Sequence, residues 1–181
     1  MTALDTRKDL IEACKRNDRR AQKKLYDDYA DAMYNICFRM LQNHDDAKDV
    51  LQMAFIQVFK NLDKYKYIST PGSWIKRIVI NCCISHCRKQ KMHFEDLDST
   101  VPYVDELPSD NDDELIMKIK NAFKKLPLGY RTVLSLYLFE GYDHGEISDI
   151  LGVSKSTSKT QYHRAKKKLK EIMEKTPNQN L

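Results

Sequence analysis

The C-terminal part of the sequence contains a run of side chains of the types that bond to DNA. Lysine and arginine bind phosphates, and together with hydroxyl and amide groups they bond to base edges in the major groove, which is wide enough to admit a helix. The candidate DNA-contacting residues are Lys155, Ser156, Lys159, Thr160, Gln161 and Arg164. The lysines that follow, at positions 166, 167, 168 and 170, add phosphate contacts or only solubility.

A second candidate site lies in the stretch DKYKYISTPGSW, where aromatic residues alternate with lysine. Such rings can stack on unpaired bases; the alternative is that Tyr65 and Tyr67 pack back on the core. The following stretch, SWIKRIVINCCISHCRKQK, contains β-branched residues, but its length and apolar spacing favour a helix over a strand. The polar side of that helix presents Lys76, Arg77, Asn81, Arg88 and Lys89.

The stretch CCISHC raises the question of a metal site. On a helix, Cys83, His86 and Cys87 would share a face and would suit zinc. Structural zinc sites usually draw ligand pairs from two separated segments, however, and no second CxxC or HxxxH occurs. We therefore expect no metal and no cofactor. The five cysteines, at positions 14, 37, 82, 83 and 87, are expected to be reduced and mostly to pack as small hydrophobes.

The elements that must position the C-terminal candidates form a helix-turn-helix. Asp143 stands three residues before Glu146, which is a capping-box arrangement with Asp in place of Ser or Thr. Gly152 allows a sharp turn, in which Val153 is expected to be buried, and Ser154 is expected to cap the next helix. A packed helix, a tight turn with glycine and a displayed second helix make up this motif.

Apolar periodicity predicts helices in the rest of the chain as well. In the first half they span about residues 22–42 and 43–62; Asn43, Asp45 or Asp46 can cap the second, whose polar face, taken alone, reads as solvent-exposed. That polar face carries Asp46, Lys48, Asp49, Gln52 and Gln57. Nearer the C-terminus, apolar faces predict helices over about 114–126 and 130–142.

Charge divides the 181 residues into three parts. Residues 1–91 have a net charge of +7, residues 92–114 contain nine acids and no lysine or arginine, and residues 115–181 have a net charge of +7. We expect an all-α protein of two small helical domains, 1–91 and 114–175, an acidic flexible linker over 92–113 and a disordered tail over 176–181. No apolar run is long enough to span a membrane and the N-terminus has no secretory signal, so the cytoplasm is the expected location.

Both basic parts resemble the sigma-70 family of RNA polymerase sigma factors, specifically the short extracytoplasmic-function (ECF) type. DDAKDVLQMAFIQVFKNL is similar to region 2.2 of that family, GSWIKRIVINCCISHCRK to region 2.4, and LPLGYRTVLSLYLFEGYDHGEISDILGVSKSTSKTQYHRAKKKL to region 4. The resemblance covers about residues 21–173. It implies a promoter-specificity subunit that directs transcription initiation and has no active site of its own. In line with this, the sequence has no nucleophile motif and no phosphate-binding loop, and no small-molecule substrate is expected.

The resemblance assigns roles to three groups of residues. Asp46, Asp49 and Gln52 would contact the clamp coiled coil of the largest subunit of core RNA polymerase. The helix-turn-helix residues named above would read the −35 element of promoter DNA. The melted −10 strand, with one base flipped out, would be held by Tyr65, Tyr67, Trp74, Lys76, Arg77, Asn81 and Arg88, although Trp74 is equally well placed to be a core residue.

The resemblance also covers the connector and the regulation of the family. The acidic connector would run through the RNA channel of the polymerase. Many members bind a membrane-bound anti-sigma factor, so the resemblance adds an anti-sigma factor to the candidate partners of this chain. The chain departs from the family at Lys48 and Met53, where Glu is frequent, at Ser85, where Asp is common, and at Ser158 in place of Val. The Ser158 change is expected to loosen the recognition helix slightly.

Two other functions fit parts of the sequence. A stand-alone helix-turn-helix regulator explains residues 115–175 but not the region 2 pattern. An adaptor that binds polymerase without reading DNA does not explain the lysine-rich displayed helix. Binding of duplex DNA by the isolated chain separates the first alternative from a sigma factor, which usually needs the core enzyme.

Overall fold

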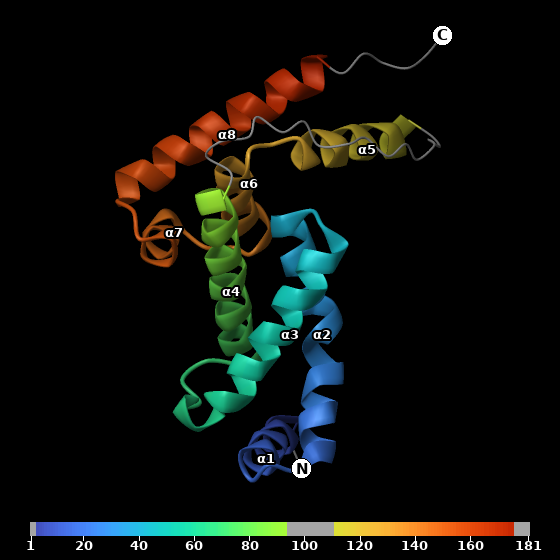
Figure 1. Ribbon diagram of the computed structural model, residues 1–181, viewed down its shortest axis with the longest axis vertical. Helices are drawn as coiled ribbons and strands as arrows, with labels where there is room; N and C mark the ends of the chain where they lie inside the picture. Colours follow the sequence, from blue (N-terminus) through green and yellow to red (C-terminus); the bar gives the residue numbers. More distant parts are fainter. Residues whose placement is uncertain (1–2, 94–110, 176–181) are drawn as a thin grey trace. The chain divides into compact units, whose positions relative to one another are not determined.

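The computed structural model describes residues 3–93 and 111–175, whose regular elements are all helices, with no strand among them (Figure 1). The all-α prediction is therefore confirmed for this part of the chain. Contacts between Cα atoms divide the chain into two units, Met1–Lys91 and Met92–Leu181. The expected disordered tail and most of the expected acidic linker lie outside the described residues. At the ends of that linker, the last helix of the first unit continues to His93 and the first helix of the second unit begins at Asn111.

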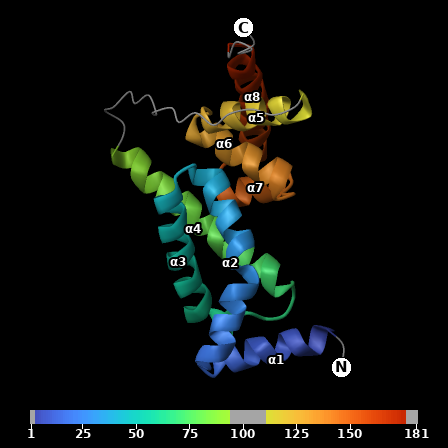
Figure 2. The same ribbon diagram turned by 90° about the vertical axis from the view of Figure 1, so that its right-hand side faces the viewer.

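The first unit contains four α-helices and one short 3₁₀-helix among its described residues. These elements are α1 (Ala3–Lys15), α2 (Arg19–Leu41), α3 (His44–Lys60), the 3₁₀-helix η1 (Leu62–Lys64) and α4 (Pro71–His93). Figures 1 and 2 show α1 crossing the N-terminal end of α2, and α1 also contacts η1. The sequence reasoning did not anticipate α1, whose inner face carries the buried residues Ile11 and Cys14.

Local signals explain where α2 and α3 begin. The side chain of Asp18 accepts hydrogen bonds from the backbone N–H groups of Arg20 and Ala21 at the start of α2. Of the three caps considered for α3, Asn43 is the one observed: its side chain accepts from the N–H groups of Asp45, at 2.8 Å, and Asp46, at 3.1 Å. Both carboxylates then lie in the first helical turn, where their negative charge interacts favourably with the helix dipole.

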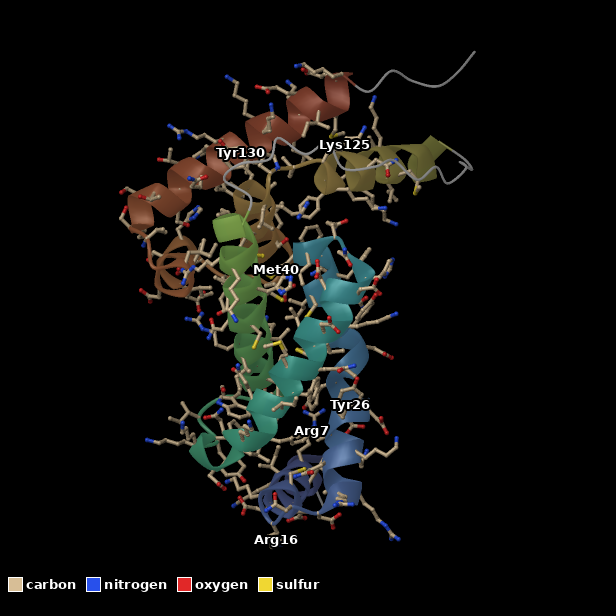
Figure 3. The ribbon with its side chains drawn as sticks, in the orientation of Figure 1. Arg7, Arg16, Tyr26, Met40, Lys125 and Tyr130 are labelled. Atoms are coloured by element: carbon tan, nitrogen blue, oxygen red, sulfur yellow. The ribbon has the colours of Figure 1, made fainter. Side chains whose placement is uncertain are left out.

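The core of the first unit lies among α2, α3 and α4. Its fully buried side chains include Met40, labelled in Figure 3, together with Val50, Val58 and Ile80. All five cysteines are buried, in line with the expectation that they mostly pack as small hydrophobes, and the Sγ atoms of Cys37 and Cys83 lie 3.6 Å apart between α2 and α4.

The environments of Cys14, Cys82 and Cys83 raise the pKa values of their thiols. Burial and the nearby Asp18 raise the pKa of the Cys14 thiol to about 11, and the hydrogen bond with Cys37, followed by burial, raises that of Cys83. Within the residues that the structure describes, no group of three or more His, Cys, Asp and Glu side chains could hold a metal ion.

The second unit consists of α5 (Asn111–Lys124), α6 (Leu128–Leu134), η2 (Ser135–Phe139), α7 (His144–Leu151) and α8 (Lys155–Lys175). Helix α8 packs against α5, α6 and α7. Phe123, Leu126, Leu134 and Ala165 form a buried cluster, against which Tyr130, labelled in Figure 3, is packed. None of the helices in the described ranges is long and apolar enough to cross a membrane.

The second unit differs from the sequence expectations in three places. The helix expected over 130–142 ends as a π-helical turn, η2, in which the N–H of Glu140 donates to the carbonyl of Ser135 at 3.2 Å. The N-terminal half of the α5 apolar face is exposed at Leu115, Ile116 and Ile119. Val153 is not buried in the turn but 38% exposed, whereas Ile147 and Ile150 of the preceding helix are buried.

Candidate nucleic-acid interface

The turn between α7 and α8 is built by the short-range contacts that the sequence predicted. Asp143 accepts from the N–H groups of Gly145 and Glu146, and the Glu146 carboxylate accepts from the N–H of Asp143 at 2.9 Å, which completes the capping box. These backbone hydrogen bonds lower the pKa of the Asp143 carboxyl. Gly152 ends α7 in the left-handed conformation with φ of 66°, and Ser154 then accepts from the N–H of Thr157 at 3.0 Å to cap α8.

Helix α8 has one anchored side and one exposed side. Ala165 has no exposed area, Ser158 is equally buried, and Tyr162 packs against the cluster of the second unit. Of the six predicted DNA-contacting residues, Gln161 is half-buried and the other five are exposed: Lys155, Ser156, Lys159, Thr160 and Arg164. The structure therefore brings all six to the N-terminal half of one helix, whose outer side is basic and polar.

The buried Ser158 has a polar partner on α7. Its hydroxyl lies 3.0 Å from Nδ1 of His144, and the imidazole ring stacks on Tyr137 with centroids 4.8 Å apart. The family-atypical hydroxyl is thus hydrogen-bonded rather than orphaned. Burial and then the positive charge of Lys159 lower the pKa of His144, which favours the neutral ring.

The second candidate interface includes the loop between η1 and α4. Thr70 caps α4, accepting from the N–H of Ser73 at 3.2 Å. Tyr65 is only 4% exposed and its hydroxyl donates to the carbonyl of Ser69, so the alternative that it packs on the core is the one observed. We therefore remove Tyr65 from the stacking candidates, because its ring is covered. Tyr67 is 39% exposed and Trp74 half-buried.

The polar candidates on α4 lie along one helix with different exposure. Asn81 and Arg88 are exposed, whereas Lys76 and Arg77 are half-buried. The loop adds one residue that the sequence reasoning missed, Ile68, whose side chain is 89% exposed. The signal was present, because an isoleucine in a Ser-Thr-Pro-Gly loop belongs to no apolar stripe.

A third surface is the outer face of α3. Asp49 and Gln52 are exposed there, and Asp46 is half-buried with its Oδ1 atom 3.3 Å from Nε2 of His86. This face also has two apolar members, each 52% exposed: Met53, which the sequence marks only as a departure from the family, and Ile56, which the sequence analysis does not single out. Their register could have identified them, since both fall outside the apolar stripe that forms the core side of α3.

Comparison with known proteins matches each unit to a family region. The model of Sigma-70 region 2 matches residues 25–92, and that of Sigma-70, region 4 matches residues 116–169. The chain is 32% identical over 174 residues to the ECF RNA polymerase sigma factor SigW of Bacillus subtilis (strain 168), covering 88% of this chain and 92% of that protein. It is 25% identical over 166 residues to the ECF RNA polymerase sigma factor SigM of Mycobacterium tuberculosis (strain ATCC 25618 / H37Rv), covering 91% of this chain and 83% of that protein.

Two solved structures share the fold. One is the sigma factor RpoE in complex with the anti-sigma factor NepR from Bartonella quintana, with a TM-score of 0.62, 21% identity, and coverage of 86% of this chain and 98% of that one. The other is CnrH in complex with the cytosolic domain of CnrY, with a TM-score of 0.58, 19% identity, and coverage of 94% and 99%. Both family regions occur in order on one chain that is similar over most of its length to ECF sigma factors, so this chain belongs to the sigma-70 family of RNA polymerase sigma factors, ECF type.

Proposed function

We propose that the chain is the promoter-specificity subunit of a bacterial RNA polymerase, which it directs to a −35 and a −10 element. The observation that carries the proposal is the presence of both sigma-70 regions on one chain, each in a unit that exposes basic and polar side chains on a helix. The polymerase performs the chemistry. The chain supplies recognition in the cytoplasm, without a cofactor or an active site of its own.

The −35 element is assigned to α8. Its exposed residues Lys155, Ser156, Lys159, Thr160 and Arg164, with Gln161 beside them, offer cationic groups for phosphates and hydroxyl or amide groups for base edges. The capped turn before the helix and the buried Ala165 fix its register, so these side chains would enter the groove as one face.

The −10 element is assigned to α4 and the loop that precedes it. Flipping a base out of the stack costs a few kcal/mol, and stacking on an aromatic ring returns about 1–3 kcal/mol per base. Tyr67 and Trp74 are the aromatic candidates for that contact. The polar and cationic candidates on α4 are Lys76, Arg77, Asn81 and Arg88.

Core polymerase is assigned to the outer face of α3, where its clamp coiled coil would dock. Asp49, Gln52, Met53 and Ile56 lie at spacings of three, one and three residues, which places them on one side of the helix, and Asp46 lies one turn earlier. Acidic groups beside exposed apolar side chains suit a docking surface for another helix. The acidic connector, residues 92–113, is assigned to the RNA channel.

An anti-sigma factor is the remaining proposed partner. The solved structures of RpoE and CnrH contain NepR and the cytosolic domain of CnrY, respectively, and this chain shares their fold. We assign this partner by that likeness alone.

Co-elution of the purified chain with bacterial core RNA polymerase on a sizing column tests the proposal first. The expected complex is then used to transcribe a library of random duplexes, which selects the promoter. Failure to bind core, together with tight binding of duplex DNA by the free chain, would instead establish a stand-alone regulator. Binding to core without selecting any DNA would establish an adaptor.

Charge reversal tests the division between the two units. Lys159→Glu with Arg164→Glu should weaken binding to the selected −35 element by about 1–3 kcal/mol per lost contact and leave core binding intact. Asp46→Lys with Asp49→Lys should do the opposite; Asp49→Lys alone is the cleaner variant, because Asp46 also contacts His86.

Lys120→Glu is the matched control, since Lys120 is exposed on α5, a helix that carries none of the residues assigned to either surface. Gel-shift titration of the holoenzyme and sizing with core measure the two activities. Equal loss of both activities in both pairs of variants would refute the assignment.

A further inference from the structure

Helix α1 lies outside both family-matched ranges, yet it is tied to the loop between η1 and α4. The hydroxyl of Tyr67 donates to Oε1 of Glu12, across 55 residues of sequence. Lys15 donates to the same Oε1 atom at 3.0 Å, and its Nζ atom is 3.4 Å from the Tyr67 hydroxyl. One carboxylate of α1 therefore accepts from both a cation of α1 and a phenol of the loop.

The Tyr67 ring also has cationic neighbours on α1. The Nζ atom of Lys15 lies 4.8 Å from the ring centroid and that of Lys8 lies 5.8 Å from it, both within the range of cation–π attraction. The backbone of Tyr67 is left-handed, with φ of 60°, which is unfavourable for an aromatic residue and persists only where surrounding contacts hold it. The contacts with α1 are of that kind.

The other end of the loop is held independently. Tyr65 donates to the carbonyl of Ser69, and the Tyr65 ring lies 4.8 Å from the Tyr67 ring and 5.3 Å from Trp74 between centroids. The rings form a row that leads from α1 to the first turn of α4. Ile68, between the two held residues Tyr67 and Ser69, is 89% exposed. The loop thus exposes the aliphatic side chain of Ile68, while the residues on either side of it are held in place.

We propose that Glu12 and Lys15 are positioning residues for the −10 contact: they hold Tyr67 in its left-handed conformation, so that the loop 66–70 presents Ile68 to the unpaired DNA strand. Aliphatic side chains inserted between bases unstack them, which gives Ile68 a role beside the aromatic residues. This inference rests on the proposed function, because it takes the loop as part of the −10 site.

Two single variants and their combination test the contact. Glu12→Ala removes the acceptor, and Tyr67→Phe removes only the hydroxyl that donates to it. Asp27→Ala is the matched control: it breaks another lysine–carboxylate pair of the same unit, Lys23–Asp27 at 2.6 Å, which involves no loop residue.

The first measurement needs neither polymerase nor DNA. Limited trypsin cleavage after Lys66, followed by mass spectrometry, reports how often the loop opens. We expect cleavage about three- to tenfold faster in Glu12→Ala and in Tyr67→Phe, no additional gain in the double variant, and no change in Asp27→Ala. An unchanged rate in Glu12→Ala would overturn the inference, whatever the chain does with DNA.

The second measurement uses holoenzyme and a single-stranded oligonucleotide that carries the non-template −10 sequence of a selected promoter. Both single variants should bind it about three- to tenfold more weakly, without additivity and with unchanged affinity for core polymerase. Faster cleavage with unchanged oligonucleotide binding would refute the role in the −10 contact.

If the wild-type chain fails to bind core polymerase, the proposed function fails and the −10 role fails with it. The cleavage rates still decide whether α1 holds the loop. The two failures are therefore distinguishable.

Discussion

Ser158→Ala tests how the two helices of the DNA-reading motif are held together. The Ser158 side chain has no exposed area, and its hydroxyl shares a 3.0 Å hydrogen bond with Nδ1 of His144 on α7. The ring of His144 is fixed in turn by Tyr137, at 4.8 Å, and by Tyr162, at 5.5 Å, between centroids. The substitution removes one oxygen atom and leaves these ring contacts in place.

Two effects of opposite sign set the size of the change. Loss of the hydrogen bond should cost about 1 kcal/mol, at the lower end of the roughly 1–3 kcal/mol for leaving a buried polar group unpaired, because His144 is only half-buried and water can reach part of its ring. Alanine is also the better helix former, which returns up to about 0.5 kcal/mol. Ser156→Ala, two positions earlier on the exposed side of α8, makes the same change of residue type without uncovering a buried partner; it removes only an exposed contact with the hydroxyl of Ser154, at 2.8 Å. Relative to that control, Ser158→Ala should be destabilised by about 1 kcal/mol, a factor of about five in the unfolding equilibrium.

Urea unfolding of the full chain can locate the effect. Trp74 is the only tryptophan of the sequence and lies in the first unit, so its fluorescence follows that unit while far-ultraviolet circular dichroism follows both. Unfolding of the second unit should appear as a transition in circular dichroism that has no counterpart in fluorescence. In Ser158→Ala the urea concentration at the midpoint of that transition should fall, and the dependence of the free energy of unfolding on urea should stay unchanged.

Equal midpoints for Ser158→Ala and Ser156→Ala would show that the buried hydrogen bond contributes no stability. A shift of the Trp74 transition would show that the effect is not local to the second unit. Either result would refute the reasoning.

Two further predictions concern charge and an exposed face. Burial and then Lys159 lower the pKa of His144, so this ring binds fewer protons in the folded unit than in the unfolded chain. The contribution of His144 to the stability of the unit is therefore present above about pH 6.5 and is lost as the pH drops below that value. His144→Asn should flatten this slope in urea titrations at several pH values, and an equal slope would contradict it. Met53→Ser with Ile56→Ser should weaken co-elution with core polymerase but change unfolding by less than about 0.5 kcal/mol, because both side chains are exposed. Unchanged co-elution would remove these residues from the docking surface.

The helix-turn-helix could be predicted almost completely, because its signals are local. The carboxylate of Asp143, the left-handed Gly152 and the hydroxyl of Ser154 each satisfy or redirect backbone groups within three residues of themselves. Such contacts depend on sequence spacing alone. The partner of Ser158 could not be predicted in the same way, because His144 lies 14 residues away and meets it only after the turn has formed.

Features of both units resisted prediction for the same reason. Whether Tyr65 stacks on DNA or packs on the core is decided by what covers its ring, and composition does not contain that information. The π-helical turn after α6 is a second example, since the apolar spacing of residues 130–142 does not change where that turn begins. Exposed residues such as Ile56 are hard to identify from the sequence, because an apolar side chain beside the apolar stripe of a helix does not stand out from the core positions.

The two proposed DNA contacts therefore differ in how they are built, and they should respond differently to change. The −35 surface stands on one helix whose start is fixed by its own neighbours in sequence, so substitutions far from α7 and α8 should leave it intact. The −10 loop takes its conformation from α1, more than fifty residues earlier, through Glu12 and Lys15. A family match that begins at residue 25 omits that helix. If the loop does contact the melted strand, α1 belongs to the promoter-recognition machinery even though no residue in it faces DNA in the proposed division of roles.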